Sequence, residues 1–159
     1  MNKTYNPLEI DTTQYVCTNV FVDLEGVLID SWDDWLALLH NKEMVQYWSE
    51  LDSFGMPCLF SNAIDNLKDS FTVTKRLGTL EDLFEQLFFN DHECCVAQRN
   101  VKRLPIWEYK QQGKRQNFID YVTSLDEGDW KNNLFVLLDD MVEDEFLRFD
   151  NFDILLVKV

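Results

Sequence analysis

Three apolar, strand-like runs in this sequence each end on side chains that could take part in chemistry. These side chains are Asp23 after residues 20–22, Ser61 with Asn62 after residues 57–60, and Asp139 with Asp140 after residues 133–138. In an open α/β sheet the carboxyl ends of parallel strands meet at one edge, and ligands bind in the crevice there. At such an edge the carboxylates could serve as a nucleophile or as metal ligands.

Alternating strands and helices are needed to bring these strand ends together. The patterning predicts strands over residues 17–22, 57–61, 94–97, 133–138 and 152–157. It predicts helices from Asp30 or Ser31 to about residue 54 (one helix or two) and over 63–71, 80–89, 114–125 and 143–149. This alternation implies right-handed crossovers and a parallel sheet. We therefore expect one α/β domain over residues 16–159, preceded by a polar arm over residues 1–15.

The composition narrows the class of protein. The chain has 159 residues, of which 46% are hydrophobic and 14% aromatic, which is enough to form one core. A net charge of −15 repels nucleic acid and anionic membranes at long range. No apolar run approaches the ~20 residues of a membrane span. The four cysteines lack Cys-x-x-Cys spacing and the first residues lack an apolar core, so we expect a cytoplasmic protein with reduced thiols.

The first strand end carries a recognisable pattern. The apolar run followed by Asp23-Leu-Glu-Gly-Val-Leu resembles motif I of the haloacid dehalogenase (HAD) superfamily of phosphohydrolases. The resemblance implies that Asp23 is the nucleophile, forming an aspartyl-phosphate, and that Glu25 is the general acid/base. Glu25 stands where the family usually has Asp, a departure that some phosphatase branches share. Gly26 would let the backbone turn sharply and approach a ligand closely.

The same resemblance assigns the phosphate-binding groups. Leu59-Phe60-Ser61 matches motif II, in which the hydroxyl of Ser61 binds a phosphate oxygen with Asn62 beside it. Motif III is a single Lys or Arg some two dozen residues before motif IV. Lys114, at the start of a helix, fits that distance best, and Lys110 is the alternative.

Motif IV supplies the remaining carboxylates. The run from Val136 to Asp144 fits an apolar strand that ends in Asp-Asp or in Gly-Asp-x-x-x-Asp. The resemblance implies Mg²⁺ as cofactor, bound by Asp23, by the backbone carbonyl of Glu25 and by Asp140. Asp139 and Asp144 are expected as supporting carboxylates.

The spacing of the motifs bears on the substrate. Neither the stretch from Asp23 to Ser61 nor that from Ser61 to Lys114 has room for a cap domain, so the chain resembles a capless member of the superfamily. Such members often act on phosphate groups of macromolecules, or oligomerise to close the site. Six of the chain's 14 basic residues lie in residues 98–115, so this block is either an electropositive rim for a nucleotide or nucleic-acid end, or a solvated loop.

Other interpretations remain open. Asp-Gly and Asp-Asp after a strand are often only turn chemistry. A HAD-like protein could bind or regulate without catalysis, or it could pass the phosphoryl group to an acceptor other than water. Neither His40 nor His92 lies near a Ser or Cys nucleophile motif, so triad chemistry has no support. We expect Mg²⁺-dependent hydrolysis of a phosphomonoester through Asp23.

Overall fold

The computed structural model describes part of the chain in detail. The described residues are 5–23, 26–27, 29–31, 34–38, 41–53, 57–60, 112–124 and 131–159. The helices expected over 63–71 and 80–89 and the strand expected over 94–97 lie outside the described residues, as do Glu25, Ser61, Asn62 and Lys110.

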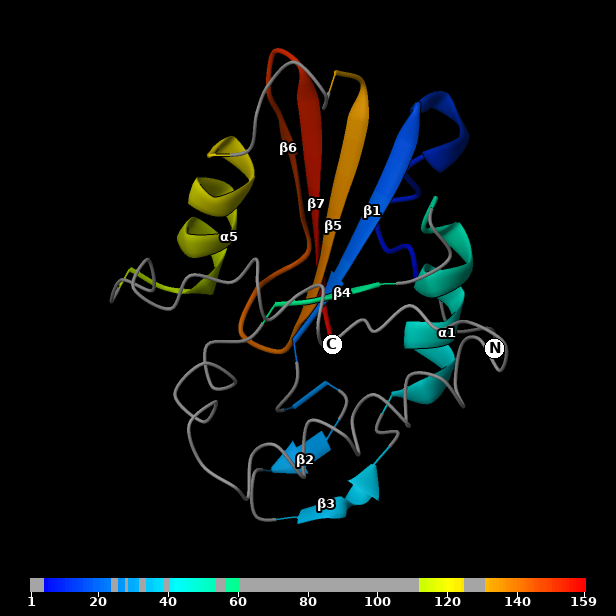
Figure 1. The fold of residues 1–159 in the computed structure, drawn as a ribbon, viewed down its shortest axis with the longest axis vertical. Helices are drawn as coiled ribbons and strands as arrows, with labels where there is room; N and C mark the ends of the chain where they lie inside the picture. The colour runs from blue at the N-terminus through cyan, green and yellow to red at the C-terminus, as the bar shows by residue number, and fades with distance from the viewer. Residues whose placement is uncertain are drawn as a thin grey trace.

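A mixed sheet forms the centre of this α/β structure (Figure 1). Its strands are β1 (Cys17–Val22), β4 (Cys58–Leu59), β5 (Asn133–Asp139), β6 (Glu145–Arg148) and β7 (Phe152–Lys158). They lie in the order β4-β1-β5-β7-β6. Strands β4, β1, β5 and β7 are parallel, as expected. Strand β6 pairs antiparallel with β7 and makes the sheet mixed. The expectation of an entirely parallel sheet was therefore wrong at this edge.

The β6 segment was expected to be a helix. Phe146 and Phe149 are spaced as on one face of a helix, but Asp150 and Asn151 also favour a tight turn. The structure forms that turn, in which the backbone N–H of Phe149 donates to Phe152 O at 3.0 Å. Pairing with the buried strand β7 thus overrides the local spacing, as tertiary context often does.

A hairpin replaces the beginning of the helix expected from Asp30 or Ser31. Strands β2 (Ile29–Ser31) and β3 (Asp34–Leu38) pair antiparallel, with Ser31 opposite Asp34. Asp and Ser suit a turn as well as a helix cap, so the capping signal was ambiguous. Helix α1 (Lys42–Leu51) begins only after Asn41, which adopts a left-handed conformation with φ 57°.

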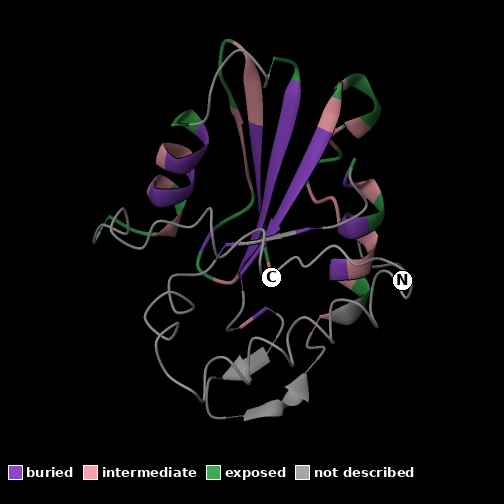
Figure 2. Cartoon of the chain, in the orientation of Figure 1, coloured by how far each residue is buried: buried purple, intermediate pink, exposed green. Residues whose placement is uncertain are grey.

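One helix packs on a face of the sheet through an aromatic cluster. Helix α5 (Lys114–Thr123) places Phe118 and Tyr121 against Phe21 and Phe135 of the central strands. Strand β5 is buried along its whole length (Figure 2). It reads as a continuous apolar run because parallel strands inside a sheet are covered on both faces.

The strand register brings the predicted chemical groups to one edge. Val22 of β1 lies opposite Leu138 of β5, and the backbone N–H of Asp23 donates to Leu138 O at 3.0 Å. Asp139 lies opposite Lys158 of β7. Asp23 and Asp139 therefore lie at the same level of the sheet, at the carboxyl ends of the neighbouring strands β1 and β5.

Residues before β1 contact the domain. Trp48 of α1, which is fully buried, donates from Nε1 to Tyr5 O at 2.7 Å. After a short 3₁₀ turn, η1 (Thr12–Gln14), the hydroxyl of Tyr15 donates to Asp153 Oδ2 at 2.6 Å. None of the helices in the described part of the chain combines the length and apolarity that crossing a membrane requires.

Candidate functional site

The first element of the site is the end of β1. Asp23 follows the last residue of the strand, and its backbone remains hydrogen-bonded to β5. The residue is 9% exposed, so its carboxylate lies at the boundary between the core and the edge of the sheet.

The end of β5 supplies two carboxylates with different surroundings. Asp139, the last residue of the strand, has a side chain that is 0% exposed, and its Oδ1 accepts from the backbone N–H of Met141 at 2.7 Å. Asp140 comes next and is half-buried. The two adjacent aspartates therefore differ in burial, the first being enclosed and the second partly exposed.

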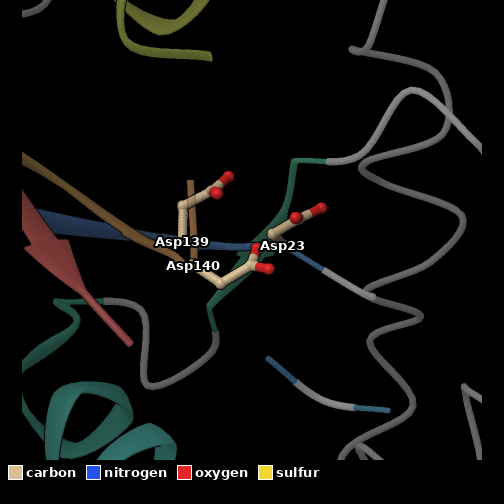
Figure 3. A group of neighbouring side chains, drawn as sticks. All are labelled: Asp23, Asp139 and Asp140. Carbon is tan, nitrogen blue, oxygen red and sulfur yellow. The ribbon is translucent and has the colours of Figure 1, made fainter. Parts of the chain in front are cut away.

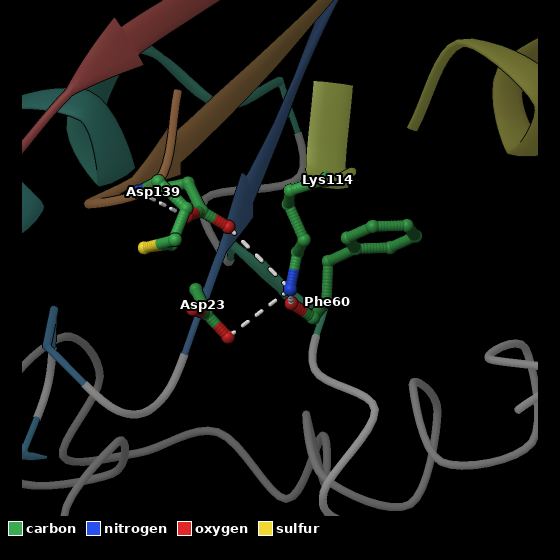
Figure 4. Close-up of polar contacts among 5 residues, drawn as sticks. Asp23, Phe60, Lys114 and Asp139 are labelled. Carbon is green, nitrogen blue, oxygen red and sulfur yellow. Dashed lines mark hydrogen bonds and ion pairs between the residues drawn. The ribbon is translucent and has the colours of Figure 1, made fainter. Parts of the chain in front are cut away.

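Lys114 joins the two strand ends. It is the first residue of α5, and its Nζ lies 3.3 Å from Asp23 Oδ1 and 3.4 Å from Asp139 Oδ2 (Figure 4). The same nitrogen donates to the backbone carbonyl of Phe60, just after β4, at 2.9 Å. The lysine side chain is 9% exposed. One ammonium group thus bridges residues at the ends of three neighbouring strands, β4, β1 and β5.

The buried carboxylate of Asp139 is incompletely compensated by its surroundings. Burial, followed by the charge of Asp23, raises the pKa of Asp139 to about 7, although Lys114 and the N–H of Met141 act in the opposite direction. Its Oδ2 is buried and has no hydrogen bond within the described part of the chain, since the contact with Lys114 at 3.4 Å is an ion pair without hydrogen-bond geometry. A buried carboxylate oxygen without a hydrogen bond is costly for a fold.

Three carboxylates are close enough to hold one cation. One oxygen from each of Asp23, Asp139 and Asp140 lies within 4.8 Å of the others (Figure 3). Oxygen donors of this kind suit Mg²⁺, which usually takes one or two protein carboxylates and completes its shell with water and phosphate. Asp23 and Asp140 fit this role best, because Asp139 is fully buried against Lys114.

The remaining predicted carboxylate that the structure describes, Asp144, is not grouped with the other three. Asp144 is exposed, and its Oδ1 accepts from the backbone N–H of Lys158 at 2.7 Å. This contact ties the loop after β5 to the end of β7. Asp144 is not part of the group formed by Asp23, Asp139 and Asp140.

Gly26 is required by the packing of the loop after β1. It has φ 82°, and a Cβ added there would lie 2.6 Å from Asp140 Cγ. The loop is also held by Asn41, whose Nδ2 donates to the carbonyl of the fully buried Val27 at 3.2 Å. The absence of a side chain at Gly26 therefore makes room for Asp140.

The basic block over residues 98–115 is described only at its end. Lys114 is engaged with Asp23 and Asp139, as above. Arg115 forms an exposed bidentate pair with Glu145 of β6, at 2.7 and 3.0 Å. Each of the two described cations of the block is therefore paired with at least one carboxylate.

Phe60 was not singled out from the sequence as part of the site. Its carbonyl holds Lys114, and its own N–H donates to Val22 O at 2.7 Å. A backbone carbonyl has no sequence signal, although the position of Phe60 directly before Ser61 at a strand end was a clue.

Comparison with known proteins gives no relative: no protein-family model, no curated protein and no solved structure matches the chain.

Proposed function

We propose that the protein is a Mg²⁺-dependent phosphomonoester hydrolase of the HAD type, with Asp23 as nucleophile. The observation that carries the proposal is the bridge from Lys114 to Asp23 and Asp139, with Asp140 beside it. A lysine held between two carboxylates at a sheet edge is an arrangement suited to receiving a phosphoryl group.

The strand order supports the proposal. From β1 the chain proceeds to β4 on one side, and from β5 it proceeds to β7 on the other side. The strand order therefore reverses between β1 and β5, and such a switch point is where doubly wound sheets bind ligands. Asp23 directly follows β1, and Asp139 is the last residue of β5. We propose that this order belongs to a Rossmann-like sheet with helices on both faces and without a cap domain.

The proposed reaction has two steps. A carboxylate oxygen of Asp23 attacks phosphorus, and the bond from phosphorus to the ester oxygen breaks as Glu25 gives that oxygen a proton. Water, losing a proton to Glu25, then attacks phosphorus, and the bond to Asp23 breaks to release inorganic phosphate. Each step breaks one P–O bond and forms one.

Lys114 would orient the nucleophile and meet the negative charge of the phosphoryl group. Its ammonium has three N–H groups, and in the described part of the chain two of them have hydrogen-bond acceptors, Asp23 and Phe60. Asp139 is within ion-pair distance without hydrogen-bond geometry. Lys114 can therefore offer its third N–H to a phosphoryl oxygen while Asp139 balances its charge.

Asp23 and Asp140 would hold the cation, as their spacing and partial exposure allow. When bound, Mg²⁺ would offset the repulsion between the carboxylates and the phosphate and stabilise transition-state charge.

The test is release of phosphate from p-nitrophenyl phosphate with Mg²⁺. Asp23→Asn should lower turnover by about 10⁴-fold or more, because an amide is not a nucleophile. Asp150→Asn, at an exposed position in the turn between β6 and β7, is the matched control and should retain wild-type turnover. Wild-type turnover in Asp23→Asn would remove Asp23 from the role of nucleophile.

The same assay separates the alternatives. Binding of Mg²⁺ and phosphate without turnover would indicate a non-catalytic module. Transfer of the phosphoryl group to an added alcohol in preference to water would indicate a phosphotransferase.

A further inference from the structure

The aromatic side chain of Phe60 lies against the lysine that bridges the site. Lys114 Nζ is 5.0 Å from the centroid of the Phe60 ring, while the carbonyl of the same residue accepts from it at 2.9 Å. Figure 4 shows the carbonyl of Phe60 at the lysine nitrogen and its ring beside the lysine chain, across from Asp23 and Asp139. One residue thus contacts the ammonium twice, through its backbone and through its ring.

The ring itself is fixed by its neighbours. Phe60 is 6% exposed. Its ring packs edge-on against the rings of Phe21 and Phe118, with centroids 6.4 and 5.2 Å away, and the ring centroid of Tyr121 lies 5.4 Å away. These partners come from β1 and α5. A ring confined in this way cannot turn aside, so its face offers a constant position for the cation.

A cation above an aromatic face is attracted by the ring quadrupole, and more strongly where water is excluded. A lysine side chain has several rotatable bonds and a compact charge, so without such contacts it samples many positions. The Phe60 carbonyl fixes one N–H direction, and the ring limits how far the ammonium can move. With Asp23 accepting a second N–H of Lys114, these contacts hold the direction of its third N–H.

We propose that Phe60 is the positioning residue for Lys114, its ring and carbonyl aiming the ammonium at the phosphoryl group. This inference rests on the proposed function, because it gives the aimed N–H a phosphoryl oxygen to bind. Phe60 acts through Lys114 and has no part in bond making.

The test compares two phenylalanines of the same core cluster. Phe60→Met keeps the carbonyl and much of the volume but removes the ring face, and Phe135→Met removes a ring from the same cluster, on β5. Binding of inorganic phosphate in the presence of Mg²⁺ is measured by calorimetry for both. Phe60→Met should weaken phosphate binding by about tenfold, and Phe135→Met should change it by less than about twofold. Phe60→Tyr retains the ring and should restore the affinity.

A second measurement reports on the contact without any ligand. In lysine labelled at Cε, the ε-methylene protons of Lys114 should show an upfield ring-current shift in the wild type. That shift should persist in Phe60→Tyr and Phe135→Met and disappear in Phe60→Met. Lys114→Arg assigns the signal.

The outcomes separate this inference from the proposed function. If the wild type binds phosphate but the two Met variants lose equal affinity, or neither loses any, Phe60 has only a packing role and the inference fails alone. If the wild type binds no phosphate, the proposed function and the inference both fail. An unshifted Lys114 signal in the wild type would also overturn the inference.

Discussion

The two ends of the parallel strands treat buried polar groups in different ways. At the amino end, Asn19 of β1 donates from Nδ2 to Asn133 Oδ1 of β5 at 3.0 Å and to Leu134 O at 3.3 Å. Asn133 in turn donates to Lys131 O at 3.2 Å. At the carboxyl end, Asp139 is also buried, but among the described residues one of its oxygens has no hydrogen-bond donor.

The difference separates two uses of polarity in one sheet. The amide pair is neutral and its hydrogen bonds are internal, so it can fix the pairing of β1 with β5 and needs nothing further. The group formed by Asp23, Asp139 and Asp140 contains three carboxylates, and Lys114 is the cation that contacts it in the described part of the chain. We infer that the carboxyl end is arranged for a ligand and the amino end for stability.

The largest expected effect is that of Lys114→Met. Removing the cation leaves Asp23 and Asp139 facing each other in a buried site, and breaking such a pair costs about 3–5 kcal/mol. Hydrolysis of p-nitrophenyl phosphate should be lost as well. Urea unfolding at neutral pH gives the loss in the free energy of unfolding.

Arg115→Met is the matched control, since it removes the next cation on the same helix. Arg115 and Glu145 are 47% and 38% exposed in their side chains. Such an exposed pair contributes about 0–1 kcal/mol. Equal losses of stability in the two variants would show that the carboxyl end is no more strained than the surface.

The second prediction concerns pH and uses the metal-free protein. The folded-state pKa of Asp139 is raised from 3.8 to about 7, mainly by burial. Between these values the folded state holds a proton that the unfolded state has released. Stability should therefore fall as the pH rises through this window, by up to about 1.4 kcal/mol per pH unit.

Asp139→Asn cannot ionise and should remove this slope, so the quantity to measure is the difference in unfolding free energy between wild type and variant from pH 5 to pH 7. The lowered pKa values of Asp11 and Glu145 act with the opposite sign and at lower pH, because their stabilisation is lost only as the pH falls through their folded-state values. Parallel curves for wild type and variant would contradict the raised pKa of Asp139.

Much of the sheet could be predicted from the sequence because its central strands are continuous apolar runs. The expected strands over 17–22, 133–138 and 152–157 correspond to β1, β5 and β7, and the helix expected after Gly113 corresponds to α5. The segments at 29–38 and 145–148 were predicted wrongly. Both segments are short and form hairpins, the first within itself and the second with β7. In runs this short, the spacing of apolar residues does not distinguish a helix from a strand.

The site could be predicted less completely. The sequence predicted that Asp23 and Asp139 lie at strand ends and that Lys114 lies at the start of a helix, because strand ends and helix starts have clear sequence signals. The separate environments of Asp139 and Asp140, the contact of Asp144 with Lys158 and the carbonyl of Phe60 were not. These depend on side-chain direction and on backbone atoms, which residue types do not specify.

The last prediction concerns the amino end of the sheet. Asn19→Ala leaves Asn133 Oδ1 without the donor that now contacts it, and a single unsatisfied buried acceptor costs about 1–3 kcal/mol. In a double-mutant cycle, adding Asn133→Ala should cost less than the sum of the single changes, because the pair is then removed together.

The cycle sharpens the comparison through what it leaves unchanged. Asn19 and Asn133 lie near the start of β1 and β5, whereas Asp23 and Asp139 lie at their ends. The variants should therefore keep wild-type affinity for Mg²⁺ in calorimetry and wild-type phosphate release, once the assay temperature is well below their melting point. A loss of Mg²⁺ affinity at that temperature would mean that the amide pair positions the carboxylates through the strands. The two ends would then act as one unit, and the division between stability and ligand binding would not hold.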